Sequence, residues 1–424
     1  MQLSLINQYL LAPAFQSTLQ RLYGVEACPA QLQRWSLLAA EAIDKLPEGE
    51  FRLFSAPGRS ELGGNHTDHN RGCVLAAAIQ LDTITVVVPR KDSRIRILSR
   101  GYDPFDLDIA STAPVAAEKG GSASLIRGVA DFFVNHGHKV GGFDAVVEST
   151  VLRGSGLSSS ASFEVLVGGI FSGLYNQDAI DPVFIARAGQ YAENRYMGKP
   201  CGLMDQTACA VGGVVGIDFR DPANPVIRKV ELDMAQAGYV LAVVDTGGNH
   251  ADLTHDYASI PTEMRAAAAA LNGVELRDVS EAVLRSHLAE LRMKVGDRAI
   301  LRSLHFFAEN DRAQAQFAAV AAGDIPGFLA LVRASGLSSV QRLQNINPSA
   351  ADGREQGIAL ALAITEDFLG NQGAFRVHGG GFAGTIQAWI PSSRYQAFKE
   401  LLEAVFGPGR VCSLRIRPDG VIGL

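Results

Sequence analysis

The chain has 424 residues, which at roughly 150 residues per domain predicts two or three domains. Its 47% hydrophobic and 19% charged residues are typical of a globular protein and argue against disorder. With 38 basic and 44 acidic residues the formal net charge is −6, so we expect no broad basic surface for nucleic acid.

The cysteine pattern favours a reducing compartment. There are five cysteines, an odd number without Cys-x-x-Cys spacing, which argues against a disulfide framework and against a zinc site. No apolar run approaches the ~20 residues that span a bilayer, and the first residues lack the basic start of a signal peptide. We therefore expect a soluble, cytoplasmic protein without a membrane partner.

Predicted strands and helices alternate in both halves of the chain, after a helical extension over 1–50 to which the sequence assigns no role. Runs rich in Val, Ile and aromatic residues predict strands at 84–88, 143–148, 214–219, 239–245, 385–390 and 411–416. Apolar residues three and four apart predict helices at 162–176, 182–197, 261–271, 298–322, 353–369 and 393–405. This alternation predicts a mixed α/β or α+β protein.

A turn-rich stretch over 218–225 predicts a domain boundary near 219–237. We therefore expect an N-terminal domain over 1–225 and a C-terminal domain over 226–424. No linker is long enough to separate them, so the two should share an interface.

Glycine-rich segments at 58–72, 154–156, 198–216 and 379–384 predict loops where the backbone turns sharply or approaches a ligand. Polar side chains crowd the first of them: Arg59, Glu61, Asn65, His66, Asp68, His69 and Asn70. Such short donors and acceptors suit a polyhydroxylated ligand, whose hydroxyls each need a partner once water is excluded. A polar surface turn explains the same residues. A metal site at His66 and Asp68 lacks a further pair of ligands.

The second segment, Gly154-Ser-Gly-Leu-Ser-Ser-Ser-Ala-Ser162, stands directly before a predicted helix. Unpaired backbone N–H groups and the positive end of the helix dipole predict a phosphate cradle there. The lysine of a Walker A loop is missing. A flexible turn with a serine cap is the alternative.

The third and fourth segments add two carboxylates and a glycine run. Glu193 lies near the end of a predicted helix and Asp205 follows a Gly/Pro break, so the two can fold back toward one pocket. A hard divalent cation and phosphoryl transfer can each use such a carboxylate, although singly each is more often a solvated charge or a cap. The glycines at 379–381 allow close approach of the backbone to a ligand or to a neighbouring loop, or they form a tight turn.

In this order and spacing, the four segments resemble the GHMP small-molecule kinase superfamily, and specifically its galactokinase branch. The signature of that branch is close to GRxNxxGEHTDYNxG, GxGLSSSAS, AExxxxGxxCGxMDQ and a GGGFGG-like loop. The corresponding segments here are Gly58–Gly72, Gly154–Ser162, Ala192–Gln206 and Gly379–Gly384.

The resemblance implies an α+β, two-lobed GHMP kinase fold, with a ribosomal S5-like N-terminal lobe, a ferredoxin-like C-terminal lobe and the active site in the cleft. It implies an enzyme that transfers the γ-phosphoryl group of ATP, with Mg²⁺, to the anomeric C1 hydroxyl of galactose or a close analogue. The implied partners are thus a sugar and ATP, and we expect a monomer or weak dimer.

The resemblance also implies roles for single residues. Asp205 resembles the catalytic aspartate and Arg59 its partner, a pair that can act through positioning and electrostatics more than through full proton removal. Ser160 and Glu193 resemble the Mg²⁺ ligands. The implied ATP-binding residues are Gly154, Ser155, Gly156, Leu157, Ser158, Ser159 and Ser160. The implied sugar-binding residues are Asn65, His66, Asp68, Gly202 and Tyr257.

Departures from the signature concern the substrate more than the reaction. Asn65 stands where the family has a Glu that accepts a hydrogen bond from the sugar's 6-hydroxyl, and His69 replaces a Tyr. An amide carries no charge and also donates, so galacturonate becomes a rival of galactose. A sugar sensor without catalysis is a second alternative, but the presence of the 154–162 loop, Glu193 and Asp205 favours an enzyme. The sugar-type 64–69 segment argues against a mevalonate or homoserine kinase.

Overall fold

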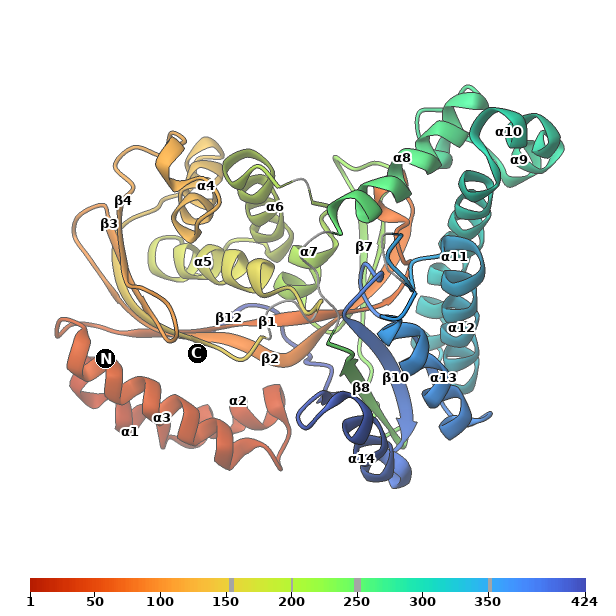
Figure 1. Ribbon diagram of the computed structural model, residues 1–424. Helices are drawn as coiled ribbons and strands as arrows, with labels where there is room; N and C mark the ends of the chain where they lie inside the picture. Colours follow the sequence, from red (N-terminus) through yellow and green to blue (C-terminus); the bar gives the residue numbers. More distant parts are fainter. Residues whose placement is uncertain (152–155, 200, 248–252, 350–352) are drawn as a thin grey trace.

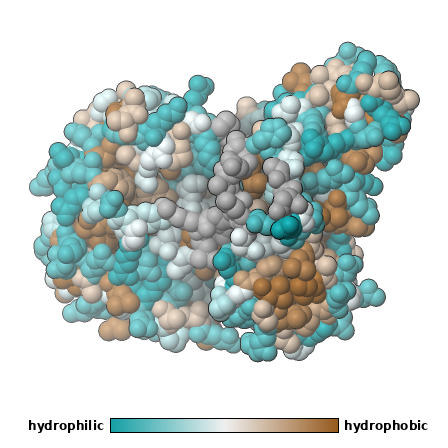
Figure 2. All heavy atoms as spheres, in the orientation of Figure 1, coloured by the Kyte–Doolittle hydropathy of each residue, from teal (hydrophilic) through white to brown (hydrophobic). Residues whose placement is uncertain are grey.

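The computed structural model describes every residue of the chain except 152–155, 200, 248–252 and 350–352. Figure 1 shows two lobes side by side, each built around a β-sheet and covered by helices. Among the described residues, no helix combines the length and the apolar character that crossing a bilayer requires. Most of the face in Figure 2 is hydrophilic, with one hydrophobic patch over the second lobe.

The first sheet carries the N-terminal lobe. In the part of the chain that the structure describes it has eight strands, ordered β12-β1-β2-β5-β3-β4, with β6 beside β2 and β7 beside β6. All pairs are antiparallel except β3 with β5. The strands are β1 (Arg52–Gly63), β2 (Cys73–Pro89), β3 (Arg94–Ser99), β4 (Phe105–Asp108), β5 (Phe143–Ser149), β6 (Val214–Asp218), β7 (Val226–Val230) and β12 (Ile422–Gly423).

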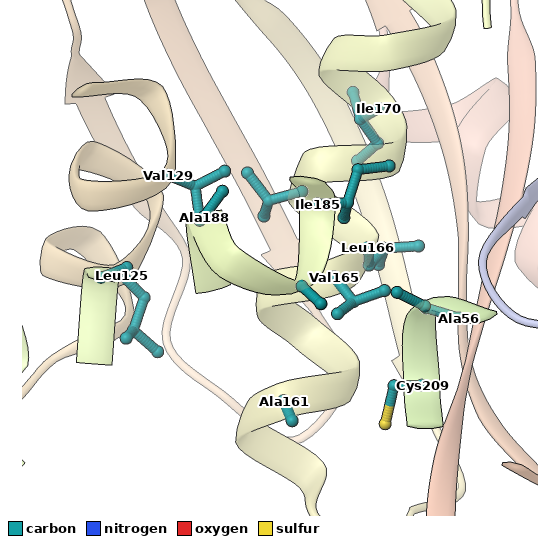
Figure 3. Close-up of a cluster of buried hydrophobic side chains, with 14 of the residues drawn as sticks. Ala56, Leu125, Val129, Ala161, Val165, Leu166, Ile170, Ile185, Ala188 and Cys209 are labelled. Atoms are coloured by element: carbon teal, nitrogen blue, oxygen red, sulfur yellow. The ribbon is translucent and has the colours of Figure 1, made fainter. Parts of the chain in front are cut away.

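Helices cover both faces of this sheet. One face packs against α4 (Ser122–Asn135), α5 (Ser159–Tyr175), α6 (Pro182–Ala192) and α7 (Met204–Val211). Figure 3 shows the core between them, where Val165 and Ile170 of α5 meet Ile185 of α6 and Val129 of α4. The opposite face packs against the N-terminal extension, which consists of α1 (Ile6–Leu10), α2 (Pro13–Tyr23) and α3 (Cys28–Lys45) (Figure 1).

The second sheet carries the other lobe and has the order β11-β8-β10-β9, all antiparallel. Its strands are β8 (Tyr239–Asp245), β9 (Ala374–Val377), β10 (Thr385–Pro391) and β11 (Val411–Leu414). Its helices are α8 (Thr254–Ala270), α9 (Glu281–Ser286), α10 (Leu288–Val295), α11 (Asp297–Ala321), α12 (Ile325–Ser338), α13 (Gly357–Leu369) and α14 (Tyr395–Phe406). The expectation of an α+β, two-lobed architecture is confirmed.

One expectation is wrong in a way that matters for the site. The glycine cluster from residue 58 predicted a loop, yet β1 continues to Gly63 and pairs with β2 throughout. Register shifts between Pro57 and Arg59, and between Glu61 and Gly63, accommodate the glycines as bulges in the strand. The side chains of Arg59 and Glu61 therefore point to the same face of a rigid strand.

The division at 225/226 stays a prediction. The strands do not divide there, because β7 begins at Val226 and still joins the first sheet. The chain also returns at its end, where Ile422 of β12 pairs with Ser55 of β1. Buried Arg417 fastens this return by donating hydrogen bonds to Ser55 Oγ at 2.7 Å and to Asp82 Oδ2 at 3.0 Å.

Candidate active site

A bidentate ion pair between Arg59 and Asp205 forms the centre of the candidate site. Arg59 extends from β1 and donates from Nε to Asp205 Oδ1 at 2.8 Å and from Nη2 to Oδ2 at 2.7 Å. Asp205 lies in the first turn of α7, where the helix dipole favours a negative charge. Burial lowers the pKa of Arg59, but the charge of Asp205 and the hydrogen bonds to it, with smaller contributions from Cys209 and Glu61, together raise that pKa overall. Arg59 is enclosed, whereas the Asp205 side chain keeps 34% of its exposure and stays reachable.

The start of α5 meets this ion pair. Ser158 precedes the helix in a left-handed conformation, and its hydroxyl donates to Asp205. Arg59 donates from Nη1 to the carbonyl of Gly156 and from its backbone N to Leu157 O at 3.1 Å. A Cβ at Gly58 would lie 2.7 Å from the oxygen of Leu157, so only glycine lets β1 approach the loop this closely. Gly154 and Ser155 lie outside the described residues.

Ser160 and Glu193 form the predicted cation site. Glu193 follows α6 in a short π-helical turn, Glu193–Met197, and is almost fully buried. The Ser160 hydroxyl donates to Glu193 Oε1 at 3.2 Å. Two adjacent ligands of an octahedral Mg²⁺ at ~2.1 Å stand about 3 Å apart, so this pair of hard oxygen atoms fits the ion. Among the described residues, no cluster of three or more His, Cys, Asp or Glu side chains suits a metal.

Gln206 and Glu164 support Glu193, and the sequence assigned neither a role. Gln206 Nε2 donates to Glu193 Oε2 at 3.0 Å and to Glu164 Oε2 at 3.0 Å. Burial, and secondly the charge of Glu193, raise the pKa of Glu164. Lys199 reaches Glu193 Oε1 at 3.1 Å from an exposed position. The position of Gln206 directly after Asp205 was the available signal.

The predicted sugar-side residues His66, Asp68 and Gly202 gather beyond the ion pair. A Cβ at Gly202 would lie 2.5 Å from Asp68 Oδ2, so this glycine permits close packing of two segments. His66 has a positive φ of 59° and its Nε2–H donates to Gly380 O at 2.9 Å. Burial lowers the pKa of His66 to about 4, so its ring is neutral near pH 7.

The glycine run of the second lobe closes onto these residues. A Cβ at Gly380 would lie 2.4 Å from Tyr257 Cε1. The Tyr257 ring packs edge-on against Phe382 with centroids 5.6 Å apart, and its hydroxyl donates to Gly381 O at 3.2 Å. Asn65 and His66 of the first lobe also donate to Gly379 O and Gly380 O, so the run serves as a close contact with a neighbouring segment, one of the alternatives that the sequence left open beside ligand approach.

Asn65 does not present its amide to an open pocket. Its side chain is fully buried and its Nδ2 donates to Glu61 Oε1 at 3.0 Å and to Gly379 O at 2.7 Å. Its Oδ1 accepts from Asn345 Nδ2 at 2.9 Å. The Asn65 amide therefore has neither a free N–H group nor an oxygen without a partner for the sugar hydroxyl that it was predicted to contact.

The sequence analysis gave Glu61 no role of its own and did not single out Arg376. Arg376 of β9 is fully buried and donates from Nη2 to Glu61 Oε1 at 2.6 Å, which ties the second sheet to the first. Burial raises the pKa of Glu61, and the charge of Arg376 opposes this effect. The signal was available, since the family signature has Asn where this chain has Glu61.

Comparisons with known proteins agree with this geometry. The family model described as GHMP kinases N terminal domain matches residues 124–213, and the galactokinase galactose-binding signature matches residues 43–89. Both matches lie in the first lobe, over the segments that form the ion pair and the start of α5.

Solved structures extend the likeness over most of the chain. Lactococcus lactis galactokinase complexed with galactose is similar with a TM-score of 0.77 at 23% identity, over 92% of this chain and 99% of that one. Methanococcus jannaschii mevalonate kinase gives 0.61 at 14%, over 87% and 99%. A D-glycero-D-manno-heptose 1-phosphate kinase from Bacteriodes thetaiotaomicron gives 0.58 at 17%, over 88% and 98%.

The chain has the GHMP kinase fold. The resemblance to the superfamily and to its galactokinase branch is confirmed by the two matched models together with this fold. These matches support a sugar kinase.

Proposed function

We propose that this GHMP kinase is an ATP-dependent galactokinase-like enzyme that phosphorylates the C1 hydroxyl of galactose or a close analogue. The bidentate contact between Arg59 and Asp205, beside the start of α5, carries the proposal. It sets a reachable carboxylate between a helix N-terminus suited to phosphates and a group of polar side chains suited to a sugar.

Asp205 acts on the acceptor hydroxyl. Its exposed carboxylate accepts a hydrogen bond from the C1 hydroxyl and holds that oxygen in line with the γ-phosphorus. Arg59 holds both carboxylate oxygens in a fixed direction, so Asp205 orients the hydroxyl and receives its proton as the new O–P bond forms. The bond to the leaving ADP oxygen breaks in the same displacement.

The start of α5 binds the phosphates of ATP. Its first backbone N–H groups and its dipole favour the negative charge of the triphosphate. Ser160 and Glu193 would hold Mg²⁺, which when bound neutralises phosphate charge. Lys199 lies near enough to Glu193 to add a further positive charge at this end of the site.

A sugar panel tests the proposal. The purified protein is given Mg-ATP with galactose, galacturonate, N-acetylgalactosamine, arabinose or glucose, and nucleoside diphosphate release is measured for each. We expect the highest kcat/KM for galactose and a 1-phosphate product. Binding of galactose without any nucleoside diphosphate release would instead support the non-catalytic sensor.

Galacturonate is the competing acceptor in that panel. It is proposed because this chain has the uncharged Asn65 where the signature has a negatively charged Glu. The buried carboxylate of Glu61, 3.0 Å from the Asn65 amide, returns a carboxylate to the same place and weakens the case for galacturonate.

The five free cysteines fit the proposed cytoplasmic location, and a monomer or weak dimer remains our proposal for the assembly.

A further inference from the structure

Glu61 and Asn65 hold the reverse of the residue types that the galactokinase signature has at these positions. The signature reads Asn and then Glu, whereas this chain has Glu61 and then Asn65. The two side chains are in direct contact, since Asn65 Nδ2 donates to Glu61 Oε1 at 3.0 Å. This chain thus keeps one carboxylate and one amide in the pair, but the carboxylate is at position 61 and the amide at position 65.

The hydrogen bonds of Asn65 leave nothing for a ligand. Both N–H groups of its amide are taken, one by Glu61 and one by the backbone of Gly379. Its oxygen accepts from Asn345 at 2.9 Å and from the Ser339 hydroxyl at 3.5 Å. Asn65 has no exposed surface and is held by hydrogen bonds within the contact between the lobes.

Glu61 has one oxygen committed and one not. Its Oε1 accepts from Arg376 at 2.6 Å and from Asn65 at 3.0 Å. No residue in the described part of the chain donates a hydrogen bond to its Oε2. Glu61 is 5% exposed, and its Oε2 is the carboxylate oxygen left to accept a hydrogen bond from a ligand.

Glu61 lies beside the catalytic pair. Glu61 follows Arg59 by two residues on β1, with regular pairing to β2 between them, so both side chains leave the same face of the strand. The charges of Arg59 and Glu61 act on each other. A buried Arg376 behind Glu61 fixes the direction of the carboxylate.

We propose that Glu61 is the sugar-binding carboxylate of this enzyme: its Oε2 accepts a hydrogen bond from a hydroxyl of the acceptor sugar, and Asn65 and Arg376 position it. This inference rests on the proposed sugar kinase function. It assigns the acceptor selectivity to a residue on a strand and removes Asn65 from direct contact with the substrate.

Glu61→Gln tests the proposal, because the amide keeps an oxygen for Arg376 and Asn65 but turns the open acceptor into a donor. Dissociation constants and kcat/KM are measured for galactose and for its 2-, 3-, 4- and 6-deoxy analogues. A lost hydrogen bond to a charged group weakens galactose binding roughly 10- to 100-fold. One deoxy analogue, which lacks the hydroxyl that Glu61 holds, should bind the variant and the wild type equally. An equal loss for all five sugars, or no loss, overturns the proposal.

Glu148→Gln is the matched control. Glu148 is likewise a carboxylate paired with arginine, accepting from Arg34 at 2.9 Å and from Arg100, but it lies at the N-terminal extension. We expect this variant to treat the five sugars as the wild type does. A sugar-dependent change in this variant would show that selectivity follows general stability and would overturn the assignment to Glu61.

The exchanged variant, Glu61→Asn with Asn65→Glu, tests the pair as a unit. Restoring the signature order should recover most of the galactose affinity that Glu61→Asn alone loses, and absence of any recovery contradicts the exchange.

Calorimetry without nucleotide separates the proposed kinase function from the proposed role of Glu61. Galactose binding that depends on Glu61, in a protein that transfers no phosphate, supports the carboxylate and refutes the kinase. If the wild type transfers phosphate and neither turnover nor binding changes in the Glu61 variant, the kinase function is supported and the role of Glu61 is refuted. A wild-type protein that binds none of the sugars refutes both the kinase function and the role of Glu61.

Discussion

The phosphate side and the sugar side of the candidate site follow the galactokinase signature to different degrees. On the phosphate side, Ser158, Ser160, Glu193 and Asp205 stand at their signature positions and join in hydrogen bonds. On the sugar side, Glu61, Asn65 and His69 all differ from the signature, although the His66 and Asp68 positions agree with it.

The difference separates reaction type from substrate choice. Charge must develop at the same atoms in any phosphoryl transfer, so groups placed against the phosphate and the attacking oxygen have little freedom to change. A sugar hydroxyl only needs a hydrogen-bond acceptor within reach. Positions 61 and 65, whose side chains are in contact, can supply that acceptor whichever of them carries the carboxylate. Variants on the two sides should therefore fail in different ways.

The largest effect is expected on the phosphate side, from Asp205→Asn. The amide cannot receive the proton and no longer balances Arg59, so kcat should fall by roughly 10³-fold or more, while galactose binding stays measurable. Nucleoside diphosphate release and calorimetry give the two readouts.

Asp218→Asn is a close control for this variant. Asp218 also accepts two hydrogen bonds from one guanidinium, Arg277, at 2.9 and 3.1 Å, and with a similar exposure of 28%. It should reduce stability without stopping turnover. Near wild-type turnover by the Asp205 variant would remove Asp205 from the mechanism.

Glu193→Gln should change the response to metal while leaving the sugar side intact. The loss of an anionic oxygen is expected to raise the Mg²⁺ concentration for half-maximal rate by roughly 10- to 100-fold. The dissociation constant for galactose in the absence of nucleotide should not move. An unchanged Mg²⁺ titration would show that Ser160 and Glu193 do not hold the ion.

The contacts of the phosphate side were easier to anticipate from the sequence than those of the sugar side for a physical reason. Ser160, Glu193 and Asp205 stand in two short motifs, 154–162 and 192–206, whose spacing is visible in the sequence. The partners of Asn65 come instead from residues about 280 and 314 positions away, Asn345 and Gly379, and no periodicity shows such pairing. The strand at 58–63 was hidden for a related reason, because glycines that predict a loop were bulges held by pairing with β2.

Asn65→Glu tests the sugar side, and we expect a smaller effect on activity than from the phosphate-side variants. It puts a second carboxylate within contact of Glu61 in a buried place, which should lower the free energy of unfolding by about 2–3 kcal/mol. The added negative charge should also increase the preference for galactose over galacturonate. Asn65→Gln, which adds length without charge, is the control, and an unchanged preference ratio would remove position 65 from the specificity argument.

The smallest effect is a pH dependence of stability that belongs to the sugar side. Burial lowers the pKa of His66 to about 4, below the ~6.5 of an unfolded histidine, so the unfolded chain binds the proton more readily. The stability that neutral His66 contributes is therefore complete above about pH 6.5 and is lost as the pH falls toward 4, by at most about 1.4 kcal/mol per pH unit. Urea unfolding at several pH values should show a shallower decline for His66→Asn than for the wild type. His305, whose pKa burial also lowers, remains in both proteins, so parallel curves would mean that burial does not hold His66 neutral in the folded protein.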